Sequence, residues 1–174
     1  MGFLFFGFFF LFLDFPIVIS GKSIDLLPTF LGCVLLLLGL WRIGNGEPRL
    51  LRMRLGAIAL GALDLCLTVL SLCSVSMGAI LATALDLGGL ALSLYLAYET
   101  AEQVKAWEKR ASRPLGGRDL SSAWFLLLFG SLLSILGAFV ESIALLCVVL
   151  QLLSVIWYQM ALYRAWRKII PPKK

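Results

Sequence analysis

The stretch DFPIVISGKSIDLLP, residues 14–28, interrupts an apolar segment that otherwise runs from residue 2 to residue 41. If it is a turn, the segment forms two membrane helices, and if not, it forms one. Pro16 ends the first helix, and the polar SGKS sequence that follows can form a link. Asp25 is suited to cap the next helix, with Pro28 in its first turn. We therefore predict a turn here, after a short first helix with a re-entrant continuation through PIVIS.

The composition is that of an integral membrane protein. Of 174 residues, 61% are hydrophobic and 14% are charged, and the mean hydropathy is +0.98, far above the usual range of soluble domains. Each crossing needs about 20 apolar residues, so the chain accommodates six crossings and leaves no room for a soluble catalytic domain. The chain has no histidine, which excludes serine–histidine, cysteine–histidine and histidine–zinc chemistry. We expect no cofactor and no metal site, and the sequence does not favour an enzyme.

Apolar runs of spanning length predict an all-α bundle of six transmembrane helices, arranged as three helical hairpins in a single domain of residues 1–174. Long connections that are basic and broken by Gly and Pro alternate with tight turns, as expected for helical hairpins. The helices are expected at about 2–15, 26–43, 52–73, 77–110, 120–139 and 142–168.

The basic residues predict the orientation of the bundle. Of the 15 Lys and Arg residues, 14 lie in residues 42–54, 105–118 and 164–174, which leaves only Lys22 for the opposite side. Cytoplasmic loops carry such an excess, so both termini should be cytoplasmic. The positive net charge therefore reflects membrane topology, and we expect the lipid bilayer as a partner and no nucleic acid.

Aromatic and charged residues near the helix ends fit the same orientation. Six aromatic residues should lie at the cytoplasmic interface, and the charged end of the fourth helix, from Glu99 to Arg110, should be solvated. The basic and aromatic C-terminal tail suits an anionic lipid surface. The six aromatic residues are Trp41, Tyr95, Tyr98, Trp124, Trp157 and Tyr158.

Two acids lie deep in apolar helices, Asp64 in the third and Asp86 in the fourth. Each is 11 residues from Val75, the centre of the turn between them, or about 16 Å along a helix, close to the bilayer midplane. Gln151 has a similar depth in the sixth helix. All three belong to helix faces rich in small and polar residues, which promote helix packing in membranes. We predict a polar layer of Asp64, Asp86 and Gln151 that either packs helices or forms a site for a proton, a cation or a solute.

The acids have no basic partner on their own hairpin, because no Lys or Arg occurs between Leu55 and Val104. Two close carboxylates in a low dielectric do not readily both ionise, so they would share a proton or bind a cation. Intramembrane acids often mark ion paths. The leading hypothesis is therefore a small transporter, or a transport component, that moves a proton, a monovalent cation or a small solute.

Two other functions remain open from the sequence. One is a non-transporting accessory or scaffold protein whose helix faces bind another membrane protein or a second copy of the chain. The other is an intramembrane aspartyl protease, which uses paired acids. The Tyr-Asp and Gly-x-Gly-Asp motifs of that protease family are absent, since both acids here follow Ala-Leu.

Residues 4–43 contain an Asp-Leu-Leu-Pro-x-Phe-x-Gly motif between two apolar helices. This region resembles the N-terminal hairpin of small, uncharacterised multi-spanning membrane proteins of Gram-positive bacteria. Thr29 stands where the resemblance implies an acid. The resemblance implies a bacterial plasma-membrane protein and no particular activity. The matching residues are Asp25, Leu26, Leu27, Pro28, Phe30 and Gly32.

Overall fold

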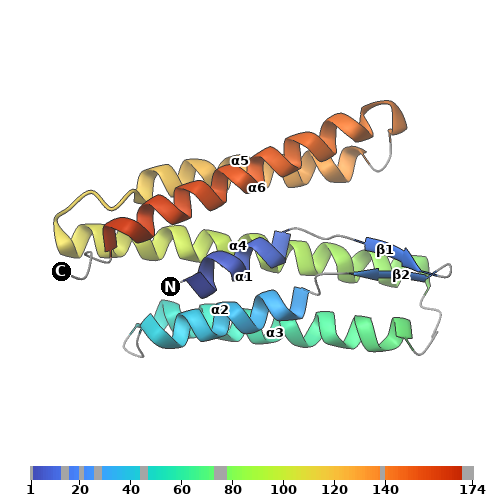
Figure 1. Ribbon diagram of the computed structural model, residues 1–174, viewed down its shortest axis with the longest axis horizontal. Coiled ribbons are helices and arrows are strands. Elements are labelled where there is room, and N and C mark those ends of the chain that lie inside the picture. Colours follow the sequence, from blue (N-terminus) through green and yellow to red (C-terminus); the bar gives the residue numbers. More distant parts are fainter. Residues whose placement is uncertain are drawn as a thin grey trace. The chain divides into compact units, whose positions relative to one another are not determined.

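The computed structural model (Figure 1) is helical apart from one short β-hairpin. It describes residues 2–12, 16–19, 22–25, 29–43, 47–72, 78–137 and 140–169. The predicted helical fold is confirmed, and each helix begins and ends within a few residues of the expected positions. The helices are α1 (Gly2–Phe12), α2 (Thr29–Ile43), α3 (Pro48–Leu72), α4 (Ala79–Ala111), α5 (Gly117–Gly137) and α6 (Glu141–Ile169).

A β-hairpin links α1 to α2. The strands β1 (Pro16–Ile19) and β2 (Lys22–Asp25) pair antiparallel, with Ile19 opposite Lys22. The β-branched residues of PIVI favour a strand, and proline is tolerated at a strand's first position. The two helices are separate, as predicted, but residues 16–19 form a strand and do not continue the first helix. Asp25 is not the N-cap either, because it lies in β2 and α2 begins only at Thr29.

Several residues of the expected turns lie outside the described part of the chain. They include Asp14, the SG pair of the first link, Pro28 and the turn around Val75. The predictions that rest on their conformation are therefore not tested by the structure.

Four of the described helices are long and apolar enough to cross a membrane. The candidate spans are Pro48–Leu70, Ile80–Ala111, Gly117–Gly137 and Ser142–Ile169. By contrast, α1 has 11 residues and α2 has 15, which gives lengths of about 16 Å and 22 Å, less than a hydrocarbon core of about 30 Å. The described residues thus indicate a membrane protein with four long candidate spans and two shorter apolar helices.

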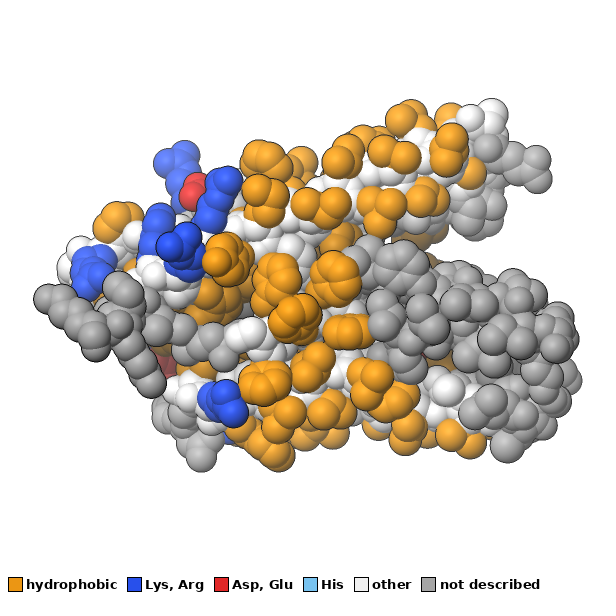
Figure 2. Space-filling view, viewed as in Figure 1, with side chains coloured by type: hydrophobic (Ala, Val, Ile, Leu, Met, Phe, Trp, Pro, Cys, Tyr) orange, Lys and Arg blue, Asp and Glu red, His pale blue; other side chains and the backbone are white. Residues whose placement is uncertain are grey.

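The chain divides into two compact units, and the boundary falls inside α4. The N-terminal unit is Met1–Leu96 and the C-terminal unit is Ala97–Lys174. The sequence analysis expected a single domain of residues 1–174. Both units carry many exposed apolar side chains (Figure 2), as expected for surfaces that face lipid.

In the N-terminal unit, α1 and α2 pack closely through glycines. A Cβ atom on Gly32 would lie only 2.9 Å from the carbonyl oxygen of Gly7, and one on Gly39 would lie 2.5 Å from Cγ of Leu4. Small residues of this kind allow membrane helices to approach closely. This contact holds α2 against α1 along most of the length of α2.

In the C-terminal unit, α5 and α6 pack through Gly130 and Gly137. A Cβ atom on Gly130 would lie 2.6 Å from Oγ of Ser154, and one on Gly137 would lie 2.8 Å from Cβ of Cys147. The small residues predicted to serve packing therefore do so in this hairpin.

Tyr158 is fully buried, and its hydroxyl donates to the carbonyl of Ala97 at 3.0 Å. Its place at the membrane interface stays a prediction. One expectation about the helix ends is wrong. Glu99 is not part of a solvated helix end, since only 5% of it is exposed. Lys109 and Arg110, further along α4, are exposed as expected.

Candidate functional site

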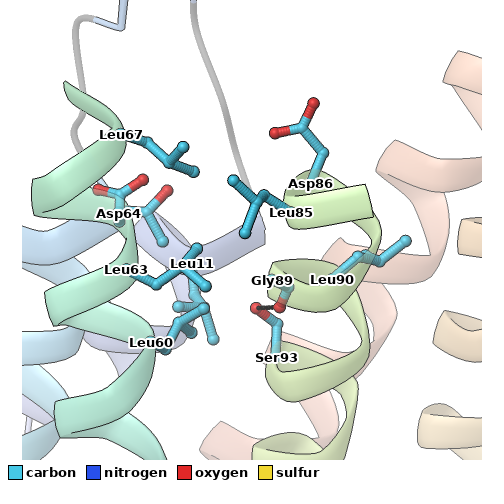
Figure 3. A pocket seen from close by; sticks show the side chains of 11 residues that line it. Leu11, Leu60, Leu63, Asp64, Leu67, Leu85, Asp86, Gly89, Leu90 and Ser93 are labelled. Carbon is cyan, nitrogen blue, oxygen red and sulfur yellow. Dashed lines mark hydrogen bonds between the residues drawn. The ribbon is translucent and has the colours of Figure 1, made fainter. Parts of the chain in front are cut away.

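Asp64 and Asp86 line one cavity within the N-terminal unit (Figure 3). Its volume is about 240 Å³, and α1, α2, α3 and α4 all contribute to its wall. Besides the two acids, the wall consists of six leucines and three small or polar residues, Thr29, Gly89 and Ser93. The cavity is therefore a mainly apolar space, and among its described lining residues the two carboxylates are the only ionisable groups.

The helix bounds explain why both acids reach this cavity. Asp64 lies eight residues before the end of α3 at Leu72, and Asp86 lies seven residues after the start of α4 at Ala79. These separations correspond to about 12 Å and 10 Å. The similar depth expected from the sequence therefore agrees with the observed helix ends.

Asp64 is bound to the N-terminus of α2. The backbone N–H of Phe30 donates to Oδ2 of Asp64 at 2.8 Å. The first N–H groups of a helix have no partner within the helix, and a negative charge there is stabilised by the helix dipole. The Asp64 side chain thus supplies, from α3, a cap for α2, close to Thr29, where the resemblance implied an acid.

Arg54 makes the corresponding contact at the other end of α2. Its Nη2 donates to the carbonyl oxygen of Leu40 at 2.9 Å. Leu40 follows Phe30 by ten residues, and Arg54 precedes Asp64 by ten, so the two contacts share one antiparallel register. An acid near the N-terminus and a base near the C-terminus both complement the dipole of α2.

Sequence reasoning missed the role of Arg54, which it assigned to a basic loop. In the structure, α3 begins at Pro48, so Arg54 lies in its second turn. The signal that could have revealed the role is the spacing of ten residues between Arg54 and Asp64, which matches most of the length of α2. We call this pair of contacts the α2 clamp.

Asp86 is arranged differently. Its side chain is exposed, and it has no hydrogen bond or ion pair with any residue in the part of the chain that the structure describes. In Figure 3, Leu67 and Leu85 lie between the two acids. Asp86 is thus the acid of this cavity whose oxygens remain available to a ligand.

Ser93 adds little polarity to the cavity. Its hydroxyl donates to the carbonyl of Gly89 within α4 at 2.9 Å (Figure 3). This back-bond is a common way for a helical serine to satisfy its hydroxyl.

Gln151 lies in the C-terminal unit, so the structure does not bring it together with Asp64 and Asp86. Its Nε2 donates to Oγ of Ser131 at 3.3 Å, which links α6 to α5. Its Oε1 is buried without a hydrogen-bond partner among the described residues. The common layer of Asp64, Asp86 and Gln151 therefore stays a prediction.

The described residues contain no group of three or more His, Cys, Asp or Glu side chains that could hold a metal ion. Comparison with protein-family models, curated proteins and solved structures finds no match to this chain. The resemblance of residues 4–43 also stays a prediction, and the function has to be argued from the geometry of the cavity.

Proposed function

We propose that this membrane protein is a small transporter, or a component of one, that binds a proton or a monovalent cation at Asp86. The observation that carries the proposal is the carboxylate of Asp86, which lines a cavity between apolar helices and has no partner among the described residues. An ionised acid at this depth is costly unless it gains a proton, a cation or a donor group. A carboxylate that binds and releases an ion in this way is suited to couple ion movement to the transport of a small solute.

The proposal assigns unequal roles to the two acids. Asp64 positions α2, because it accepts the N–H of Phe30, whereas Asp86 exchanges the ion. Six leucines make up most of the described cavity wall, so the bound ion would be held mainly by Asp86 and by water.

The proposed topology is a six-helix arrangement in the bacterial plasma membrane, with both termini cytoplasmic. The basic segments follow α2, α4 and α6, whereas the links from α3 to α4 and from α5 to α6 have none, which favours this orientation. Whether α1 and α2 cross fully or enter the membrane and return, the N-terminus stays on the side of the basic segment at residues 47–54.

Flux measurements on purified protein in liposomes test the proposal. Vesicles that contain a trapped pH-sensitive dye receive a pH gradient, with potassium and valinomycin to clamp the potential. Wild-type protein should dissipate the gradient faster than empty vesicles. Asp86→Asn should abolish this flux, and Asp86→Glu, which keeps a carboxylate, should retain part of it. Equal flux in wild type and Asp86→Asn would refute the role of Asp86.

An accessory membrane protein is the second candidate. The α2 clamp supports it, because that contact gives Asp64 a purely structural role. The exposed apolar side chains of α6, such as Leu145 at 79% exposure, offer surface for another membrane protein. Wild-type protein that carries no flux above empty vesicles, with either a proton or a sodium gradient, would favour this candidate. Because Leu67 and Leu85 lie between the two acids in Figure 3, we do not propose an aspartyl protease.

A further inference from the structure

A groove runs along α6 in the C-terminal unit, beside the start of α5. It consists of two adjoining cavities of about 340 Å³ and 230 Å³ that share Asp119, Ala161 and Arg164. We call this the α5–α6 groove. It is separate from the cavity of Asp64 and Asp86, since every residue that lines it belongs to the C-terminal unit.

One end of the groove is strongly positive. Arg164, Arg167 and Lys168 line it, with Asp119 as the single acid. None of these four side chains forms an ion pair or hydrogen bond with a residue in the described ranges. Figure 2 shows Lys and Arg side chains gathered together over this part of the unit. The three cations therefore remain available to an anion from outside the chain.

The backbone at this end is also open. Gly116 lines the groove with a φ of 96°, and a Cβ atom at this position would lie 3.8 Å from Nζ of Lys168. A residue other than glycine would be strained in this conformation and would reduce the space beside Lys168. Gly116 thus allows the backbone conformation that brings the start of α5 beside Lys168.

The other end of the groove is apolar. Trp157 and Met160 line it, and Trp157 is 56% exposed. From Trp157 to Lys168 the helix rises about 16 Å. The groove therefore changes from cationic to apolar over a length that fits a lipid headgroup and the first part of its acyl chain.

We propose that the α5–α6 groove binds an anionic phospholipid. Arg164, Arg167 and Lys168 would bind the phosphate, because guanidinium and ammonium groups form charge-assisted hydrogen bonds with phosphate oxygens. Trp157 and Met160 would contact the upper acyl chain. A free phosphate could use the cationic end alone, but the apolar end on the same groove favours the phosphate of a lipid. Basic pockets between membrane helices commonly bind such headgroups.

Lipid titration of the full-length protein in detergent tests the proposal. Bound phosphatidylglycerol and phosphatidylcholine with identical acyl chains are counted by native mass spectrometry. Wild type should prefer phosphatidylglycerol. The triple variant Arg164→Gln, Arg167→Gln, Lys168→Gln should bind it on the order of 100-fold more weakly, because each surface cation contributes about fivefold.

A matched control changes three cations outside the groove. Lys109, Arg113 and Arg118 are exposed and do not line it, so their replacement by Gln removes the same charge and should leave the preference within threefold of wild type. Asp119→Asn removes the one acid of the groove and should tighten phosphatidylglycerol binding several-fold. This gain cannot arise from misfolding.

Three outcomes would overturn the proposal. The first is equal binding of the two lipids by wild type. The second is an equal loss in the control triple, which would show a general charge effect. The third is displacement of phosphatidylglycerol by equimolar inorganic phosphate, which would identify a soluble phosphate as the occupant.

Discussion

The two walls of the acid-lined cavity differ sharply, although each presents the same local sequence. Asp64 and Asp86 both lie in Ala-Leu-Asp-Leu and at similar distances from their helix ends. On the α3 side, the carboxylate is bound to the first turn of α2. On the α4 side, the carboxylate is exposed and has no partner in the described part of the chain. An acid in an apolar helix can thus serve packing or binding, and the neighbouring helix decides which.

Two glycines of the N-terminal unit, one in α2 and one in α4, differ in the same way, and their replacement gives the largest expected effect. A Cβ atom on Gly32 of α2 would lie within 3.0 Å of both the Gly7 carbonyl oxygen and Cβ of Phe10, whereas one on Gly88 of α4 would have nothing within 4 Å. We expect Gly32→Ala to destabilise the protein by about 1–3 kcal/mol, because the helices must separate. Gly88→Ala should be neutral or stabilise it by about 0.5–1 kcal/mol.

Thermal unfolding in one detergent, followed by circular dichroism at 222 nm, measures both glycine variants. Gly88→Ala is the matched control, since it adds the same methyl group to a helix of the same unit. Equal melting temperatures for the two variants would show that α2 is not packed as described.

The second comparison concerns the acids themselves. Asp64→Ala removes the cap of α2 and should destabilise the protein by about 1–2 kcal/mol. Asp86→Ala should change stability by no more than about 0.5 kcal/mol, because the side chain has no partner to lose. The same unfolding measurement tests the pair, and a greater loss from Asp86→Ala would reverse the roles assigned here.

The smallest expected effect is at the other end of the α2 clamp. Arg54→Met keeps an apolar stem but removes the group that donates to the Leu40 carbonyl, and should cost about 0.5–1 kcal/mol. Arg52→Met, two residues away at an exposed position, is the control. If Arg52→Met costs as much as Arg54→Met, the loss reflects the charge of the segment and not the clamp.

The sequence was sufficient to predict the helices, since apolar length and basic loops are properties of single segments. It did not predict the strands at residues 16–19 and 22–25, because a short apolar run such as PIVI is compatible with both helix and strand. Nor did it predict the burial of Glu99 and Tyr158. Burial depends on the helices that pack against a residue, which periodicity along one helix does not identify.

The position of the site along the helices was predictable from the sequence, but the roles of its two acids were not. The depth of Asp64 and Asp86 follows from counting residues, and the structure places both along one cavity. Their separate roles depend on the register of α2 against α3, which is a tertiary property. Only the contacts of Phe30 and Leu40 reveal that register.

The α2 clamp also bears on the order in which the chain is assembled during translation. Phe30 and Leu40 precede their partners Asp64 and Arg54 by 34 and 14 residues. When α2 leaves the ribosome, the groups that hold both of its ends are still inside the exit tunnel. The two ends of α2 can therefore be fixed only after α3 has emerged.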